Sequence, residues 1–314
     1  MDIQLLRTFL AVSDTGSFGA ASARLYVTQS AVSLRVQRLE DQLGRPLFER
    51  SRAGARLTPA GAAFERYALS ILRSWEEARQ QLAVPEGYCE ALSIGAEHAL
   101  WPRLGFRWID ALRAARPTLA VRAELGRADR LTRFLIEGQC QVALTYTPQI
   151  RPGLTAAPVL EDELILVAAF PTDGPDDPAL RAAYAFCDWG TEFARAHAAA
   201  LPGLTGTPVT LALGTLAADY ASRRHAAAYT PARAARRMLD AGTLHLVPDA
   251  PIFPYPIWSV VRDDLDADLA RSARETLEAI AREAESVQDE VLGTLDEISE
   301  QAVTIMDPVH GADR

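Results

Sequence analysis

The chain has 314 residues, a formal net charge of −9 and an apolar fraction of 49%. This length predicts about two domains, and this composition is typical of a soluble globular protein and excludes a disordered chain. The longest apolar run, 164–170, is far shorter than the roughly 20 residues that span a bilayer. Three scattered cysteines and the lack of a basic segment before an apolar one at the N-terminus predict a cytoplasmic protein without a disulfide framework.

The charge is distributed unevenly along the chain. Residues 1–58 carry eight Arg against five acidic residues, a net +3, so the remainder carries −12. Thirteen acidic residues fall within 263–300 alone. A small basic module on an acidic body is a pattern that nucleic-acid-binding proteins use.

Residues 5–44 contain three helical patterns. Apolar spacing predicts a first helix around Leu5, Leu6, Phe9 and Val12. Ser17 is placed to cap a second helix over 18–25, and Thr28 to cap a third from 29 to about 43, where Gly44 ends it. We expect the buried stripe of the third helix to be Val32, Val36, Leu39 and Leu43.

The opposite face of the third helix carries small polar, amide and guanidinium groups. Such a helix, placed after a short turn, fits a DNA major groove, where Gln reads adenine and a helix N-terminus meets phosphate. A plain solvated face of a three-helix bundle is the alternative. The candidate DNA contacts on this helix are Thr28, Gln29, Ser30, Ser33, Leu34, Arg35, Gln37 and Arg38.

Residues 47–58 predict two short strands around a tight turn at Gly54. Arg50, Arg52 and Arg56 line this segment. A hairpin with three guanidinium groups in seven residues is able to lie against phosphate or in a minor groove.

Together these segments resemble the winged helix-turn-helix of LysR-type transcriptional regulators. The resemblance is carried by Thr28-Gln-Ser-Ala-Val-Ser33, Leu39-Glu40, Leu43-Gly44, Leu47-Phe-Glu-Arg50 and Leu57-Thr-Pro-Ala-Gly61. It covers about sixty contiguous residues and implies a DNA-binding domain over 1–58 that reads double-stranded DNA. The family also implies a small-molecule effector, a homodimer or homotetramer, and allows RNA polymerase as a further partner.

A long helix is predicted over 59–82, opened by Thr58 and Pro59. Its apolar residues step by four and three, which is a heptad seam on which two such helices could pair. An amphipathic helix packed on its own domain is the alternative. In the family this helix joins two DNA-binding heads, so 59–87 is the expected linker, with a hinge at 85–87. The candidate dimerisation residues are Phe64, Ala68, Ile71, Trp75, Ala78 and Leu82.

Beyond residue 88, strand-like runs alternate with helical patterns, which predicts a mainly parallel sheet with helical crossovers. Strands are expected at 92–95, 120–125, 141–145, 163–169, 209–213, 244–247 and 257–261, and helices at 101–115, 128–137, 193–200, 216–224 and 232–239. This order resembles the family's two-lobed effector domain, which is similar to periplasmic binding proteins. The expected fold is α/β, with an effector domain over 88–283, lobe one at about 90–165 and 256–283, and lobe two at about 166–255.

A narrower resemblance rests on two short segments. Leu92-Ser-Ile-Gly-Ala96 with Leu100-Trp101, and Asp188-Trp-Gly190 with Phe193, are similar to a subgroup that includes a repressor of the flagellar master operon.

We expect a small polar or anionic effector between the lobes, because strand C-termini and helix N-termini from both lobes should converge there and their free N–H groups favour anions. Glu97 stands where family members often have a small hydroxyl residue, so the charge of the effector stays open between an anion and a cation. Trp189 is equally consistent with a core aromatic. The candidate effector residues are Ala96, Glu97, His98, Arg127, Asp129, Thr145, Tyr146, Thr147, Trp189, Gly190 and Thr191, with Tyr229 and Thr230 near the mouth.

No nucleotide-binding, metalloprotease or serine-hydrolase motif occurs in the sequence, and the five histidines lack metal spacing. We therefore expect a non-catalytic sensor without cofactor or metal. Two alternatives are a small-molecule-binding protein whose winged helix contacts proteins, and an enzyme with an unrecognised site.

Residues 284–314 run past the common end of the family. Apolar residues from Leu277 to Ile298 keep a near-heptad spacing. This acidic extension is predicted to be either a helix for oligomerisation or a helix folded back on its own lobe.

Overall fold

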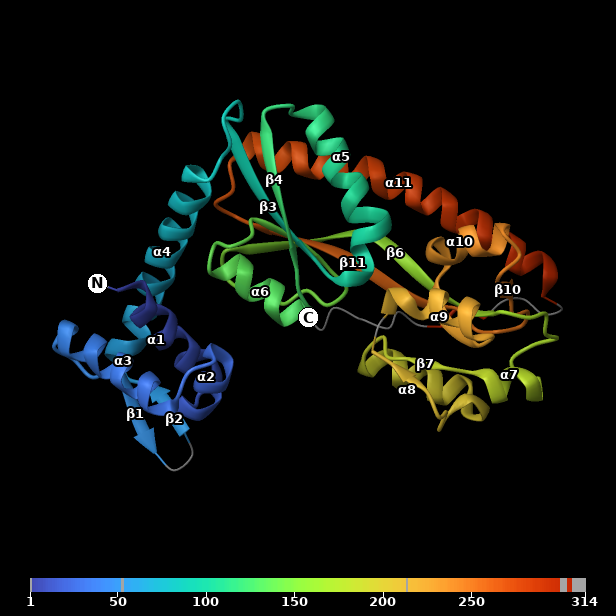
Figure 1. Cartoon of the computed structure of the whole chain (residues 1–314), viewed down its shortest axis with the longest axis horizontal. Coiled ribbons are helices and arrows are strands. Elements are labelled where there is room, and N and C mark those ends of the chain that lie inside the picture. Colours follow the sequence, from blue (N-terminus) through green and yellow to red (C-terminus); the bar gives the residue numbers. More distant parts are fainter. Residues whose placement is uncertain (1, 52–53, 213, 300–303, 307–314) are drawn as a thin grey trace. The chain divides into compact units, whose positions relative to one another are not determined.

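A computed structural model describes residues 2–51, 54–212, 214–299 and 304–306 (Figure 1). The chain forms two compact units: a smaller one of residues 1–85 together with 136–139, and a larger one of residues 86–135 together with the chain from 140 onward. Each unit has its own hydrophobic core. None of the helices in the described ranges has the length and apolarity required to cross a membrane.

The smaller unit is a winged helix-turn-helix followed by a long helix. Its elements are α1 (Ile3–Thr15), α2 (Phe18–Leu25), α3 (Gln29–Leu43), β1 (Phe48–Ser51), β2 (Gly54–Leu57) and α4 (Pro59–Leu82). The three expected N-caps are confirmed, since the side chains of Ser17, Thr28 and Thr58 each accept a hydrogen bond from a backbone N–H in the first turn. Side-chain oxygens that satisfy these otherwise unpaired donors fix where each helix begins.

The core of the smaller unit lies between α1, α3 and the start of α4. Phe9, Val36 and Leu39 are fully buried there. Leu43 was expected in the same stripe but is 39% exposed, because it is the last residue of α3, directly before the left-handed Gly44. Gly61 lets α4 begin against the wing, since a Cβ at this position would lie 2.2 Å from the Leu47 carbonyl oxygen.

The larger unit contains a seven-stranded mixed sheet among the described residues. The strand order is β10 (His245–Leu246), β6 (Leu154–Ala168), β11 (Phe253–Arg262), β5 (Val142–Thr145), β3 (Glu90–Ala96) and β4 (Leu119–Leu125), and β9 (Ala227–Pro231) also pairs with β6. A separate parallel pair joins β7 (Phe186–Cys187) to β8 (Thr210–Leu211). The two-lobed α/β architecture expected from the sequence is confirmed. The expectation of a mainly parallel sheet is wrong, because β6 and β11 form an antiparallel crossover between the lobes and pair antiparallel with β5, β9 and β10 as well.

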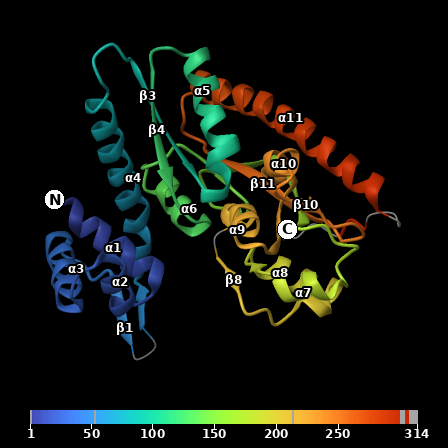
Figure 2. The ribbon, with the colours of Figure 1, turned by 45° about the vertical axis from the view of Figure 1, so that its right-hand side comes forward.

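Helices cover both faces of this sheet (Figures 1 and 2). They are α5 (Phe106–Ala115), α6 (Ala128–Ile136), α7 (Pro178–Ala183), α8 (Thr191–Ala200), α9 (Ala217–Arg224), α10 (Ala232–Asp240) and α11 (Ala267–Ile298), with short helical turns η1 (His98–Leu100), η2 (Trp101–Gly105), η3 (Pro202–Leu204) and η4 (Gly214–Leu216). The helix expected at 101–115 begins as a π-helical turn over η2.

The two crossover strands are longer than the sequence predicted. β6 begins nine residues before the expected 163, and β11 begins at 253 rather than 257. The exposed first half of β6 and the prolines Pro254 and Pro256 of β11 obscured the strand pattern. The strand expected at 209–213 is confined to β8, and residue 213 lies outside the described ranges.

Candidate DNA-binding surface and effector site

The exposed face of α3 presents most of the predicted DNA-contacting side chains. Thr28, Gln29, Ser30, Leu34, Gln37 and Arg38 are exposed, and Ser33 and Arg35 are half-buried. Leu34 is 49% exposed, although its neighbours on the other face, Val32 and Val36, are completely buried. An exposed leucine among amide and guanidinium groups is consistent with contact to base edges.

The wing is attached directly to the recognition helix. Glu40 of α3 accepts hydrogen bonds from the backbone N–H groups of Leu47 (2.6 Å) and Phe48 (3.2 Å), which hold the start of β1. Arg56 is exposed on β2, and the exposed Arg50 stacks over the Phe18 ring at 4.3 Å from its centroid. This stacking orients the Arg50 guanidinium. Arg52 lies outside the described residues.

The predicted seam of α4 divides into two parts. Phe64, Ala68 and Ile71 pack against the core of their own unit, with the Phe64 ring 5.3 Å from that of Phe9. Trp75, Ala78 and Leu82 are exposed. The heptad spacing of the first half therefore reflects packing on α1, and only the second half leaves an unpartnered apolar face within the described residues.

Tyr67, which the sequence analysis missed, extends that exposed face. It is 56% exposed, compared with 47% for Trp75 and 88% for Leu82. Its position one turn before Ile71 was the available signal.

Glu97 is the centre of the predicted effector site. It directly follows β3, and its Oε1 accepts hydrogen bonds from the Thr145 hydroxyl and from the Tyr146 backbone N–H at 3.0 Å. Its second oxygen, Oε2, has no hydrogen-bond partner among the described residues. Burial raises the pKa of the Glu97 carboxyl, and the hydrogen bonds from Thr145 and Tyr146 offset part of that rise.

The other lobe-one candidates lie around this carboxyl. Arg127 and Asp129 are exposed and act electrostatically on Glu97 with opposite signs. Ala96 is buried at the end of β3, and His98 and Thr147 are exposed.

Trp189 of lobe two meets this cluster. Its ring lies 6.4 Å from that of Tyr146, and its Nε1 donates a hydrogen bond to the Tyr229 carbonyl at 3.2 Å. At 4% exposure Trp189 is a core aromatic located where the lobes meet. Gly190 and Thr191 follow it at the start of α8, and η1 of lobe one packs beside η4 of lobe two.

Two lobe-two candidates are corrected by the structure. Tyr229 and Thr230 were expected near the mouth of the site, but both are fully buried. Tyr229 lies on the fully buried strand β9 under α8, and its hydroxyl donates to the Pro251 carbonyl at 2.9 Å. Neither side chain is available to a ligand in this conformation.

Tyr255 of β11, which the sequence analysis missed, lies among the candidate effector residues. Its ring lies 4.3 Å from that of Tyr146, and its hydroxyl donates to the Trp189 carbonyl. Burial raises the pKa of Tyr255, and the nearby charges of Glu97 and Asp188 raise it further. The hydroxyl therefore stays protonated, and an aromatic cluster from both lobes and the crossover borders Glu97.

A buried ion pair lies beneath this cluster. Asp162 of β6 is fully buried and pairs with Arg233 of α10, with 2.7 Å between Arg233 Nη2 and Asp162 Oδ2. Asp162 also accepts a hydrogen bond from the Tyr146 hydroxyl at 2.9 Å. Burial and the Asp162 charge hold the pKa of Tyr146 well above its usual range, so this hydroxyl acts as a donor.

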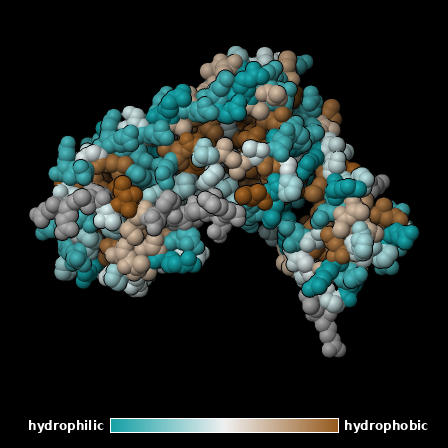
Figure 3. All heavy atoms as spheres, turned by 180° about the vertical axis from the view of Figure 1, so that it is seen from behind, coloured by the Kyte–Doolittle hydropathy of each residue, from teal (hydrophilic) through white to brown (hydrophobic). Residues whose placement is uncertain are grey.

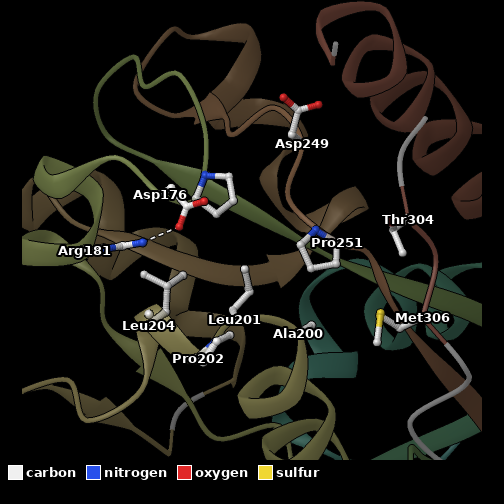
Figure 4. Close-up of a pocket in the computed structure, with 12 residues that line it drawn as sticks. Asp176, Arg181, Ala200, Leu201, Pro202, Leu204, Asp249, Pro251, Thr304 and Met306 are labelled. Carbon is white, nitrogen blue, oxygen red and sulfur yellow. Dashed lines mark hydrogen bonds and ion pairs between the residues drawn. The ribbon is translucent and has the colours of Figure 1, made fainter. Parts of the chain in front are cut away.

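A separate cavity of about 460 Å³ lies in lobe two (Figure 4). An ion pair between Asp176 and Arg181 stands at one side of it. None of the predicted effector residues lines this cavity; its lining consists of Pro175, Asp176, Arg181, Ala200, Leu201, Pro202, Gly203, Leu204, Asp249, Pro251, Thr304 and Met306. In the parts of the chain that the structure describes, no group of three metal-ligating side chains is present.

Comparisons with known proteins identify the class that these two units define. Residues 3–62 match the family described as "Bacterial regulatory helix-turn-helix protein, lysR family", and residues 85–283 match the "LysR substrate binding domain". The chain belongs to the LysR family of transcriptional regulators. It therefore combines a sequence-specific DNA-binding domain with an effector-binding domain.

Curated relatives indicate which subgroup of the LysR family this chain resembles. The HTH-type transcriptional regulator HdfR of Escherichia coli is 32% identical over 269 residues, which cover 83% of this chain and 91% of that protein. HdfR of Yersinia enterocolitica is 36% identical over 201 residues, covering 62% and 68%. These relatives support the narrower subgroup expected from the sequence.

Solved structures share the fold. ArgP from Mycobacterium tuberculosis is 24% identical with a TM-score of 0.53, and the match covers 90% of this chain and 97% of that one. Full-length LysG from Corynebacterium glutamicum with bound effector Arg is 21% identical with a TM-score of 0.52, covering 90% and 99%.

Proposed function

We propose that this regulator binds duplex DNA as a homodimer, through α3 and the wing, and senses a cationic small molecule at Glu97. The DNA-binding part is supported by the exposed polar face of α3 beside the wing arginines. One head covers only a half-site, so two heads joined along the exposed apolar half of α4 explain tight operator binding. A cytoplasmic location follows from the DNA target.

Glu97 carries the proposal for the effector. Glu97 is a half-buried carboxylate in which Thr145 and Tyr146 hold one oxygen and the other has no hydrogen-bond partner within the part of the chain that the structure describes, which suits a charged hydrogen-bond donor. Of the charges nearby, Asp188 adds negative potential beside Tyr255, whereas at Glu97 the negative charge of Asp129 is opposed by the positive charge of Arg127. Amino and guanidino compounds match this chemistry, and the Arg bound to LysG, a protein of the same fold, is one such compound.

The test compares arginine with citrulline, a neutral molecule of nearly the same shape. Arginine should raise the melting temperature of the full chain, and citrulline should not. Glu97→Gln should weaken arginine binding about 10- to 100-fold, the range for losing a hydrogen bond to a charged group, whereas the surface variant Glu192→Gln should leave it unchanged. Because only the ionised carboxylate attracts a cation, binding should strengthen as pH rises through the raised pKa of Glu97.

Two results would contradict the proposal. The first is that arginine, lysine, agmatine and putrescine all fail to bind. The second is an anionic ligand whose affinity is the same in Glu97→Gln and in the unaltered chain.

The same proposal assigns the larger unit to sensing rather than to catalysis. A gel shift with DNA from upstream of the protein's own gene separates it from an enzyme or from a protein-binding winged helix. Ser33→Ala and Gln37→Ala should change sequence preference by about 1–3 kcal/mol. If these variants bind each DNA sequence with the same relative affinity as the unaltered chain, the placement of α3 in the major groove is contradicted.

A further inference from the structure

Helix α11 runs along both lobes of the larger unit. Figures 1 and 2 both show it passing α5 at one end and α10 at the other. The match to the substrate-binding domain family ends at residue 283, so the last fifteen residues of α11, 284–298, extend beyond that match. The helix surface seen from behind is largely hydrophilic, but a buried stripe continues through Ala284, Val291 and Leu295 (Figure 3). The extension therefore folds onto its own domain, which confirms the second of the two alternatives predicted from the sequence.

The first half of α11 is fixed to lobe one. The buried Trp108 of α5 donates from Nε1 to the Ala273 carbonyl at 2.9 Å and to the Thr276 hydroxyl at 3.1 Å. Arg107 forms an ion pair with Glu283, the last residue of the family match.

The extension then contacts the crossover strand β6 through one side chain. Gln288 is 5% exposed; its Nε2 donates to the Glu161 carbonyl at 2.8 Å, and its Oε1 accepts from the Glu163 N–H at 3.2 Å. A residue of a parallel neighbouring strand makes this same pair of bonds. β9 pairs with β6 only from Leu164 onward, so the Gln288 amide continues the sheet edge where β9 ends.

The strand on the other side of β6 is compatible with this arrangement. Pro254 and Pro256 of β11 lie opposite Glu163 and Glu161. Because the bonding groups of Glu161 and Glu163 face Gln288, the two prolines occupy positions where no N–H is required toward β6. The backbone of this stretch of β6 therefore depends on Gln288 for its hydrogen bonds.

Between these two residues lies Asp162, the acceptor for Tyr146 and Arg233. At its far end the extension is fixed to lobe two, where Glu290 pairs with Arg236 of α10 and the Ser299 hydroxyl accepts from the Asp249 N–H at 3.2 Å. The helix thus contacts lobe one, the crossover and lobe two in succession.

We infer that residues 284–299 are a strut that holds the lobe crossover fixed, and that Gln288 is the positioning residue through which it acts on Asp162 and Tyr146. Rotation of one lobe against the other bends β6 and β11 at this point and breaks the Gln288 bonds. The strut therefore restricts lobe movement. That Tyr146 borders an effector rests on the proposed function; the mechanical role does not.

Hydrogen exchange of the full chain tests the strut. Gln288→Met keeps the side-chain volume but removes both hydrogen bonds. We expect exchange of the Glu163 N–H and of the segment around Tyr146 to become about tenfold faster, since one lost buried hydrogen bond corresponds to about that factor. Exchange in α1–α3 should not change.

A second pair of variants tests the strut by the same exchange measurement but changes only exposed side chains, so the buried packing around Gln288 stays intact. Glu290→Gln removes the ion pair with Arg236, and we expect about two- to fivefold faster exchange at Glu163. Glu285→Gln makes the same chemical change on an exposed residue of the same helix and should have no effect.

The strut is refuted if Gln288→Met alters exchange only within α11, or if Glu290→Gln and Glu285→Gln behave alike. Arginine provides the separate functional measurement. If arginine binds the unaltered chain, Gln288→Met should weaken arginine binding, although Gln288 does not contact the proposed effector site at Glu97. If arginine does not bind, the proposed effector class fails and the exchange experiment still decides the strut.

Discussion

Replacing Asp162 by alanine should destabilise the larger unit more than an ordinary core substitution. Asp162→Ala leaves the Arg233 guanidinium, on a side chain only 4% exposed, without its counter-charge. It also removes the acceptor of the Tyr146 hydroxyl. Breaking a buried ion pair from one side costs about 3–5 kcal/mol, and an unpaired buried hydroxyl about 1–2 kcal/mol.

These two costs overlap, because both groups share one carboxylate. We expect a loss of about 4–6 kcal/mol in the free energy of unfolding, which lowers the melting temperature by about 10–20 °C for a domain of this size. The measurement is thermal unfolding of the full chain at pH 7, followed by circular dichroism or calorimetry.

Two controls make the result specific. Glu192→Gln removes an exposed ion pair with Arg195 and should cost less than about 1 kcal/mol. The double variant Asp162→Leu with Arg233→Met removes both charges together and should recover most of the loss, since a buried pair contributes little net stability. A melting temperature for Asp162→Ala equal to that of Glu192→Gln would refute the reasoning, as would a double variant no more stable than Asp162→Ala alone.

Three further predictions concern other parts of the chain. Arg50→Ala and Arg56→Ala should weaken binding to all DNA sequences. Each should reduce the slope of the logarithm of the binding constant against the logarithm of the salt concentration by up to about one unit; an unchanged slope would show that the wing does not contact the DNA phosphates. The double variant Trp75→Glu with Leu82→Glu should bring charge into the proposed dimer seam, weaken the free energy of dimerisation by about 3 kcal/mol or more and give monomers in sedimentation. A persistent dimer would place the interface elsewhere. Burial and neighbouring acids raise the pKa of Glu163 from 4.5 to about 7, so its contribution to stability is full below pH 4.5 and is lost as pH rises through 7. Glu163→Gln should therefore stabilise the chain at pH 8 relative to pH 5 by about 1 kcal/mol, after allowance for water at this half-buried group, and equal stability at both pH values would contradict this.

The smaller unit could be predicted almost residue by residue because its determinants are local. Ser17, Thr28 and Thr58 each cap the helix that begins one residue later, and Gly44 ends α3. A capping side chain pairs with backbone N–H groups two or three residues later, so the local sequence alone predicts where the helix begins. The α4 seam could be predicted only in part, because a heptad pattern does not distinguish packing on α1 from packing on a second chain.

The arrangement of the candidate effector residues could be predicted from the sequence in lobe one and only partly in lobe two. Glu97 and Thr145 follow neighbouring strands of one sheet, so the rule for strand ends brought them together correctly. Tyr229 and Thr230 follow no such rule, since they lie within a fully buried strand rather than beyond its end. Tyr255 was missed because prolines flank it on both sides and hid the strand that carries it.

The contacts that join the lobes had no signal in the sequence because they connect distant residues through backbone groups or buried charges. Arg233 lies 71 residues from Asp162, and Gln288 lies 127 residues from Glu161. Gln288 sits in a helical stripe where an apolar residue would satisfy the periodicity, and a polar residue there is unfavourable unless its amide is paired. Its two bonds to β6 supply that pairing. The periodicity alone does not distinguish such a buried polar position from a surface one, so the backbone edge that Gln288 pairs, at the lobe crossover, is found only in the structure.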